Sequence, residues 1–195
     1  ETPQAAAQGA GRVPQSVLDQ AEAATRAMGQ QILQGNFKVA LERMYPRWKK
    51  RAAKKLQGGQ VELARRLAEI PKEMTRQGIS MLNYEVRKPT SAHEVVLLRR
   101  EDKEGRPINM YLEWLVFVPT RAEYRVIDPE TRLPRKIETL GFQVAVNKKG
   151  TPDWHFIDGR NCSIADLRSF FPGLPEDQKL LGLPEVGGGE IRRER

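Results

Sequence analysis

The chain has 195 residues, with 33 Lys and Arg against 25 Asp and Glu, which gives a formal net charge of +8. Hydrophobic residues make up 39% of it, enough for one domain of this length to bury a core without a metal or a disulfide. The single cysteine, Cys162, excludes an intrachain disulfide and a cysteine-rich zinc site. The longest uninterrupted apolar run, residues 114–118, is too short to cross a bilayer, so no transmembrane segment is expected.

The first fifteen residues are rich in Ala, Gln, Gly and Pro and show no apolar period. We therefore expect residues 1–15 to form a disordered leader or linker. Because such a linker often follows a removed signal peptide and Glu1 is not a methionine, this end favours an exported protein, periplasmic or extracellular. A trimmed cytoplasmic protein is the alternative.

Three helical stretches are expected next, over residues 16–34, 37–56 and 61–77. In each of them apolar residues recur at spacings of three and four, which places them on one helix face. Pro46 falls inside the second stretch and removes a backbone donor there, so we expect a break or a kink near Tyr45.

After residue 78 the apolar period becomes that of strands. The expected strands cover residues 79–88, 94–99, 108–118 with an extension to 127, 136–146 and 154–157. In the third strand every even position is apolar and the first odd positions are polar, so the even face is expected to lie on the core. The predicted core consists of Leu41, Met44, Trp48, Leu112, Trp114, Val116, Phe142 and Val144. Helices followed by a meander of antiparallel strands define an α+β domain.

The last part of the chain, residues 161–195, is expected to form a short helix and a Pro/Gly-rich tail. Four leucines could pack on the domain as an irregular clasp, namely Leu174, Leu180, Leu181 and Leu183. From Gly187 onwards the composition of three glycines and charged residues predicts a loose end.

Two short segments and the order of the elements suggest a relationship. Residues 35–41 (GNFKVAL) and Tyr45-Pro46 resemble the small-residue break and short second helix of the nuclear transport factor 2-like superfamily. Residues 154–159 (WHFIDG) resemble the closing strand of that superfamily. The resemblance covers residues 16–160. It implies N-terminal helices packed against a strongly curved antiparallel sheet, which forms a cone with a pocket at its mouth.

The resemblance also implies where chemistry would lie. Catalytic members of the family need a carboxylate or histidine base in an apolar pocket, and a tyrosine or acid that holds a developing oxyanion. The pocket candidates in this chain are Tyr84, Tyr111, Glu113, Trp154, His155 and Asp158. Tyr111 and Glu113 share one strand face, and a polar sheet surface is the alternative interpretation of that pair. Nucleophile, phosphate-loop and metal-protease motifs are absent, so we expect no metal and no cofactor, and the catalytic residues are unknown.

The strongest electrostatic feature is a stretch from Arg43 to Lys55 with seven basic residues and no acidic one. Its basic patch consists of Arg43, Arg47, Lys50, Arg51 and Lys54. A basic helix face can meet nucleic acid or an anionic membrane, whereas a solvated face is the more ordinary interpretation. No aromatic residues alternate with these charges, so stacking on single-stranded nucleic acid is unsupported and nucleic acid is not the expected partner.

Taken together, these features favour a non-catalytic module that binds a small apolar ligand or a protein. A small pocket enzyme of the isomerase or dehydratase kind is the first alternative, and non-specific nucleic-acid binding is the second. Leu115 and Phe117 interrupt the otherwise polar odd face of the third strand. An exposed apolar patch there would favour a homodimer formed through the sheet.

Overall fold

The order of secondary structure follows the prediction from the sequence. The computed structural model describes residues 13–190. The helices are α1 (Gln15–Leu33), α2 (Lys38–Glu42), α3 (Pro46–Lys54), α4 (Gly59–Arg76), α5 (Ile164–Phe170) and α6 (Gln178–Leu181), with a 3-10 helix η1 (Gly159–Asn161). The strands are β1 (Ser80–Val86), β2 (Ser91–Glu101), β3 (Pro107–Ile127), β4 (Pro134–Lys148), β5 (Trp154–Asp158) and β6 (Gly187–Glu190). All of their pairings are antiparallel, so the α+β class is confirmed.

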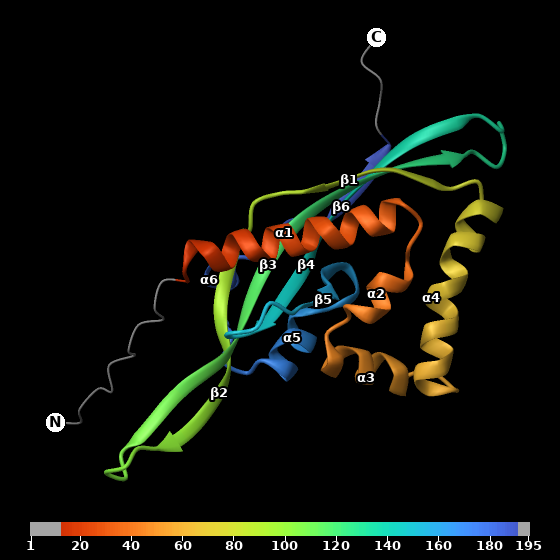
Figure 1. The fold of residues 1–195 in the computed structure, drawn as a ribbon. Helices are drawn as coiled ribbons and strands as arrows, with labels where there is room; N and C mark the ends of the chain where they lie inside the picture. Colours follow the sequence, from red (N-terminus) through yellow and green to blue (C-terminus); the bar gives the residue numbers. More distant parts are fainter. Residues whose placement is uncertain (1–12, 191–195) are drawn as a thin grey trace.

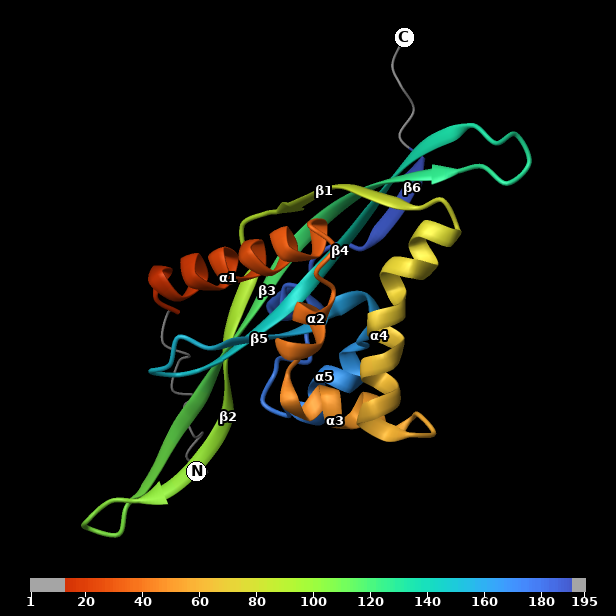
Figure 2. The same ribbon diagram turned by 45° about the vertical axis from the view of Figure 1, so that its right-hand side comes forward.

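The sheet is open, and each of its edges consists of two strands placed end to end. Along β3, residues 120–125 pair with β1 and residues 107–117 pair with β2. Along β4, residues 143–147 pair with β5 and residues 137–140 pair with β6. The long β3 and β4 therefore run through the whole sheet, and the β2–β3 and β3–β4 hairpins extend at its opposite ends (Figures 1 and 2).

One face of the sheet, here called the helical face, is covered by α1 and α2 (Figure 1). Val17, Ala21 and Met28 of α1 pack there in one cluster with Val116 and Val118 of β3. These are the positions that the helical and strand periods predict for the core. Within residues 13–190, no helix is both long enough and apolar enough to cross a bilayer.

The predicted break at Pro46 is confirmed, and it carries the chain past the edge of the sheet. Before it, Tyr45 N–H donates to the Phe156 carbonyl at 2.9 Å, and Phe156 N–H donates to the Arg43 carbonyl at 2.8 Å. The backbone thus runs beside β5, with an isolated parallel bridge at Met44. Pro46 is the first residue of α3, a position where a missing N–H costs nothing.

The opposite face, here called the C-terminal face, is covered by the C-terminal segment, residues 162–186. Leu115 and Phe117 of β3 have no exposed surface. Six buried side chains of the segment share their cluster, namely Cys162, Leu167, Phe170, Phe171, Leu174 and Leu181. The sequence predicted an apolar patch at this point of the otherwise polar face of β3, but the patch is not exposed, because the C-terminal segment covers it.

Hydrogen bonds hold the C-terminal segment to β2 and to Thr90, the residue before it. The Ser91 hydroxyl donates to the Leu181 carbonyl at 2.7 Å, and the Thr90 hydroxyl donates to the Gly182 carbonyl at 2.7 Å. The ring nitrogen Nε2 of His93 lies 3.0 Å from the same Leu181 carbonyl. The clasp expected from the leucines is confirmed for Leu174 and Leu181, whereas Leu180 is 68% exposed.

Other expectations need correction. Of the predicted core, Val116, Phe142 and Val144 are buried, while the remaining five residues are only half-buried: Leu41, Met44, Trp48, Leu112 and Trp114. The loose end expected from Gly187 is wrong for Gly187–Glu190, because these residues pair with β4 as β6. Residues 1–12 of the expected leader and residues 191–195 of the tail lie outside the described residues.

Candidate functional site

Two of the cavities in the structure lie on opposite faces of the sheet and each have two of the predicted pocket residues in their lining. The tyrosine cavity, of about 300 Å³, is lined by Tyr84 and Asp158. The Glu113 cleft, of about 330 Å³, is lined by Glu113 and His155. The other two candidates lie elsewhere. Trp154 borders a smaller hollow beside α1 and α2, and Tyr111 is an exposed residue of the β2–β3 hairpin.

The tyrosine cavity lies where the helices meet the sheet. Its apolar wall comes from α1, the α1–α2 turn, α4 and β1, through Ile32, Phe37, Ile70 and Met81. Its polar lining comes from the strands and from the turn after β5, through Tyr84, Thr120, Tyr124, Thr139, Gln143, Asp158 and Arg160. Such a combination of an apolar wall and a few convergent polar groups is typical of small-molecule sites.

Tyr84 reaches the cavity because α1 has a glycine at the point of contact. A side-chain Cβ at Gly29 would clash with two ring carbons of Tyr84, so only glycine lets the ring lie against the helix. The Tyr84 hydroxyl is buried and has no hydrogen-bond partner among the described residues. Thr120 and Gln143 are close enough to influence its pKa, but neither makes a hydrogen bond of normal geometry with it. Burial is the main cause that raises the pKa of Tyr84 to about 12.

The polar end of the cavity is formed by Tyr124 and by the turn after β5. The Asp158 carboxylate accepts hydrogen bonds from the Arg160 N–H at 3.1 Å and from the Asn161 side chain at 2.7 Å, and so caps η1. Arg160 follows directly and lies over Gly141 of β4. Burial raises the pKa of Tyr124, and the charge of Arg160 opposes that rise.

The Glu113 cleft lies on the C-terminal face, next to the point where the chain enters α3. The Tyr45 hydroxyl donates to Oε2 of Glu113 at 3.0 Å. Burial, followed by the Glu113 charge, raises the pKa of Tyr45 to about 12. His155, Lys148 and Asp153 complete a lining of mixed charge. The hydrogen bond from the buried Tyr45 holds the Glu113 carboxylate in place, so we assign this pair a structural role.

We expect Tyr45→Phe to lower the free energy of unfolding by about 1–3 kcal/mol at pH 7, because the mutation removes a buried hydrogen bond to a charged group. The pKa of Tyr45 lies above its ordinary value in the folded state, so the unfolded chain loses this proton first. The stabilising contribution is thus present below pH 10 and lost as the pH rises to 12.

Urea denaturation at pH 7, 10 and 11.5 checks this expectation. The alkaline loss of stability is expected to be smaller in Tyr45→Phe than in the unmodified chain. Tyr111→Phe is the matched control, because Tyr111 is exposed. It should change neither the free energy of unfolding at pH 7 nor its loss at alkaline pH. Equal behaviour of the two variants would contradict the assigned role of Tyr45.

The predicted basic patch is divided by the fold. Arg43 precedes α3 and therefore does not share its face with the other basic residues. Arg47 donates to the Phe170 carbonyl at 2.9 Å, and Arg51 pairs with Asp166 at 3.3 Å. Both guanidinium groups also lie over the Phe170 ring, at 5.2 and 3.9 Å from its centre. Two of the five predicted cations thus hold α5 in place, which leaves fewer charges for a phosphate backbone.

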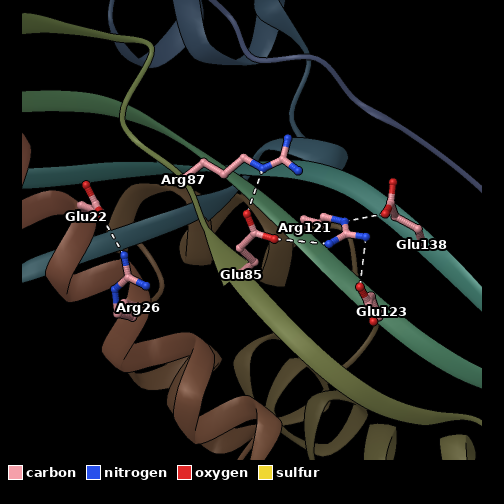
Figure 3. Close-up of polar contacts among 7 residues, drawn as sticks. All are labelled: Glu22, Arg26, Glu85, Arg87, Arg121, Glu123 and Glu138. Carbon is pink, nitrogen blue, oxygen red and sulfur yellow. Dashed lines mark hydrogen bonds and ion pairs between the residues drawn. The ribbon is translucent and has the colours of Figure 1, made fainter.

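A second charged cluster lies on the strands near the other end of the sheet. Arg121 pairs with Glu85 at 3.3 Å, with Glu123 at 3.0 Å and with Glu138, while Arg87 also contacts Glu85 (Figure 3). Glu123 and Glu138 are directly opposite each other across β3 and β4, an arrangement that repels unless a cation lies between them. Arg121 supplies that cation, so the cluster is explained by the stability of the sheet.

Metal and thiol chemistry gain no support from the described part of the chain. Within residues 13–190, no three His, Cys, Asp or Glu side chains are grouped so that they could hold a metal ion. Cys162 is buried, and burial is the main cause that raises the pKa of its thiol to about 12. Reactive thiols have lowered pKa values, so this side chain is a core residue.

Comparisons with protein-family models, with curated proteins and with solved structures found no match to this chain. The candidate site therefore rests on its own geometry. Of the tyrosine cavity, the sequence predicted Tyr84 and Asp158 but not Tyr124 or Arg160. Tyr124 could have been predicted, because it lies at an even position of the extended third strand and therefore on the predicted inner face.

Proposed function

We propose that this chain is a non-catalytic ligand-binding module and that the tyrosine cavity is its binding site. The observation that carries the proposal is the Tyr84 hydroxyl, which is buried at the cavity and has no partner among residues 13–190. An unpaired buried hydroxyl costs about 1–3 kcal/mol, and native proteins seldom retain one without a reason. A ligand that offers a hydrogen-bond acceptor would remove this cost.

The architecture that we propose is a nuclear transport factor 2-like cone. Three features support it: the order of helices and strands, the long antiparallel β3 and β4, and a cavity placed between the helices and the sheet. The C-terminal segment on the opposite face would be an addition to that plan, and it fills the face through which the sequence suggested dimerisation.

A small pocket enzyme remains the alternative, and the environment of Asp158 is what makes us prefer binding. Among the described residues Asp158 is the one carboxylate that lines the cavity. Both of its oxygens accept hydrogen bonds within its own turn, so it is engaged as a cap instead of being free to take a proton from a substrate. The Tyr84 and Tyr124 hydroxyls can donate hydrogen bonds to an acceptor of the ligand. Such contacts are sufficient for binding and need no catalytic group.

Titration with acetophenone, a neutral carbonyl compound that fits a cavity of this size, tests the proposal. Methyl NMR signals of Ile32, Ile70 and Met81 should shift on binding, since these side chains form the apolar wall. Tyr84→Phe should weaken binding about 3–10-fold through loss of one hydrogen bond. The same variant without ligand should be as stable as the unmodified chain or slightly more so, because no protein partner is lost.

Tyr111→Phe again serves as the control and should change neither affinity nor stability. A clear loss of stability in ligand-free Tyr84→Phe would show that the hydroxyl has a protein partner, and would remove the main support for the proposal. Failure of acetophenone to move the three methyl signals at millimolar concentration would count against the cavity as a binding site.

A further inference from the structure

The tyrosine cavity contains a cation that the fold does not use. Within residues 13–190, the Arg160 guanidinium forms no ion pair and no side-chain hydrogen bond, although its residue lines the cavity. Arg47, Arg51 and Arg121, by contrast, are held by protein partners. Arg160 lines the same cavity as the unpaired Tyr84 hydroxyl, and together the two groups suggest a partner that is bound from outside.

The position of Arg160 is fixed by its neighbours. Its backbone N–H is held by the Asp158 cap, which sets the start of the side chain. Its stem passes over Gly141, where a Cβ would lie only 3.0 Å from the Arg160 Cδ and 3.1 Å from Cγ. Glycine at this point of β4 therefore makes room for the aliphatic stem of Arg160, while the residue as a whole remains accessible to solvent.

Several hydroxyl groups that can donate hydrogen bonds line the cavity together with Arg160. The hydroxyls of Tyr84, Tyr124 and Thr120 lie along the cavity wall, and the Arg160 charge is felt at the Tyr124 hydroxyl. The one charge of opposite sign, on Asp158, has both carboxylate oxygens committed to the turn of η1. A ligand with a negative charge and two oxygens would match the planar guanidinium of Arg160.

We infer that the ligand of the tyrosine cavity is a small organic carboxylate, whose carboxylate is recognised by Arg160 together with the Tyr84 hydroxyl and whose apolar body lies against Ile32, Ile70 and Met81. This inference rests on the proposed function, and it adds the chemical class of the ligand. The residue that sets this specificity is Arg160, which could be lost without loss of the cavity.

Benzoate and acetophenone provide the test, because they have nearly the same shape and differ in charge. Each is titrated into the full chain at pH 7, with the methyl signals of Ile32, Ile70 and Met81 as the readout. Benzoate is expected to bind about tenfold more tightly than acetophenone, since a charge-assisted hydrogen bond is roughly twice as strong as a neutral one. Arg160→Gln should weaken benzoate binding much more than acetophenone binding and so remove this preference, and circular dichroism should show that the variant is folded.

Arg125→Gln is the matched control for net charge. Arg125 follows Tyr124 on β3, so its side chain points to the other face of the sheet, and it is exposed. Its loss removes one positive charge near the site and should preserve the preference for benzoate.

The possible results separate the inference from the proposed function. If neither compound moves the three methyl signals, both fail. If acetophenone binds as tightly as benzoate, or if Arg125→Gln and Arg160→Gln reduce benzoate binding equally, the cavity stands and the assignment to carboxylates is overturned. If benzoate moves only signals outside the cavity, the assignment is likewise overturned.

Discussion

A chain that ends after Asn161 is expected not to fold into a stable monomer, although it retains α1 to α4 and five of the six strands. The truncation removes Cys162 and five large buried apolar side chains from the cluster that contains Leu115 and Phe117. Burial of one such side chain contributes about 1.5–3 kcal/mol. Five of them contribute about 7–15 kcal/mol, as much as the whole stability of an ordinary domain.

Circular dichroism and gel filtration of the truncated chain check this expectation. The expected outcome is loss of the cooperative unfolding transition, or aggregation through the uncovered C-terminal face. A chain that ends after Val186 is the control, because it keeps the C-terminal segment and loses only β6 and the residues beyond it. It should unfold cooperatively. A soluble, cooperatively folded chain of 161 residues would show that the segment is an accessory and not half of the core.

Phe117→Ala is expected to lower the free energy of unfolding by about 3–5 kcal/mol, the range for loss of a core aromatic ring. Phe117 has no exposed surface, and its ring makes T-shaped contacts with those of His93 and Phe142, with ring centres 6.0 and 5.9 Å apart. The neighbouring Trp114 is larger but only half-buried, and its ring supports Lys149 at 4.0 Å.

Trp114→Ala should therefore cost less than Phe117→Ala, and urea denaturation of the two variants compares them directly. The even–odd alternation of β3 by itself predicts the reverse order, because Trp114 lies at an even position and Phe117 at an odd one. A larger loss for Trp114 would mean that the C-terminal face contributes less than its burial indicates.

The period of the sequence was sufficient to predict the class of the fold. Alternation located β3 and β4 to within a few residues, and Pro46 marked the end of one helix and the start of the next. Alternation failed where a second layer covers the sheet. Residues 114–118 form a continuous apolar run, and such a run is typical of a strand that is buried on both faces. Interpreted in that way, it would have predicted a covering layer.

The covering layer itself is difficult to predict because it has little regular structure. α5 and α6 are too short to show a helical period. One local signal was present, since Ser163 and Asp166 form a capping box at the start of α5. The glycines of β6 are poor strand formers, so its pairing with β4 depends on the neighbouring edge and not on its own residues.

The candidate site was predicted in part for the same reason. Tyr84 and Asp158 belong to segments with a clear strand pattern, and both line the tyrosine cavity. The roles of Gly29 and Gly141 depend on close contacts between elements far apart in the chain, and periodicity holds no information on these contacts. Arg160 was missed because nothing in the sequence distinguishes an arginine after the closing strand from any other surface arginine. Only the structure shows that its side chain lines the cavity without a protein partner among the described residues.

The layer on the C-terminal face also sets an order of events during synthesis. All strands that contain Leu115, Phe117 and Val144 precede residue 159, whereas Leu181 follows it by more than twenty positions. At a translation rate of about 5–20 residues per second, the ribosome needs roughly 1–5 s to add this stretch. Throughout that time the nascent sheet can be covered on one side only. The apolar residues of the other side are then open to chaperones, and the domain completes its folding only as its last residues emerge.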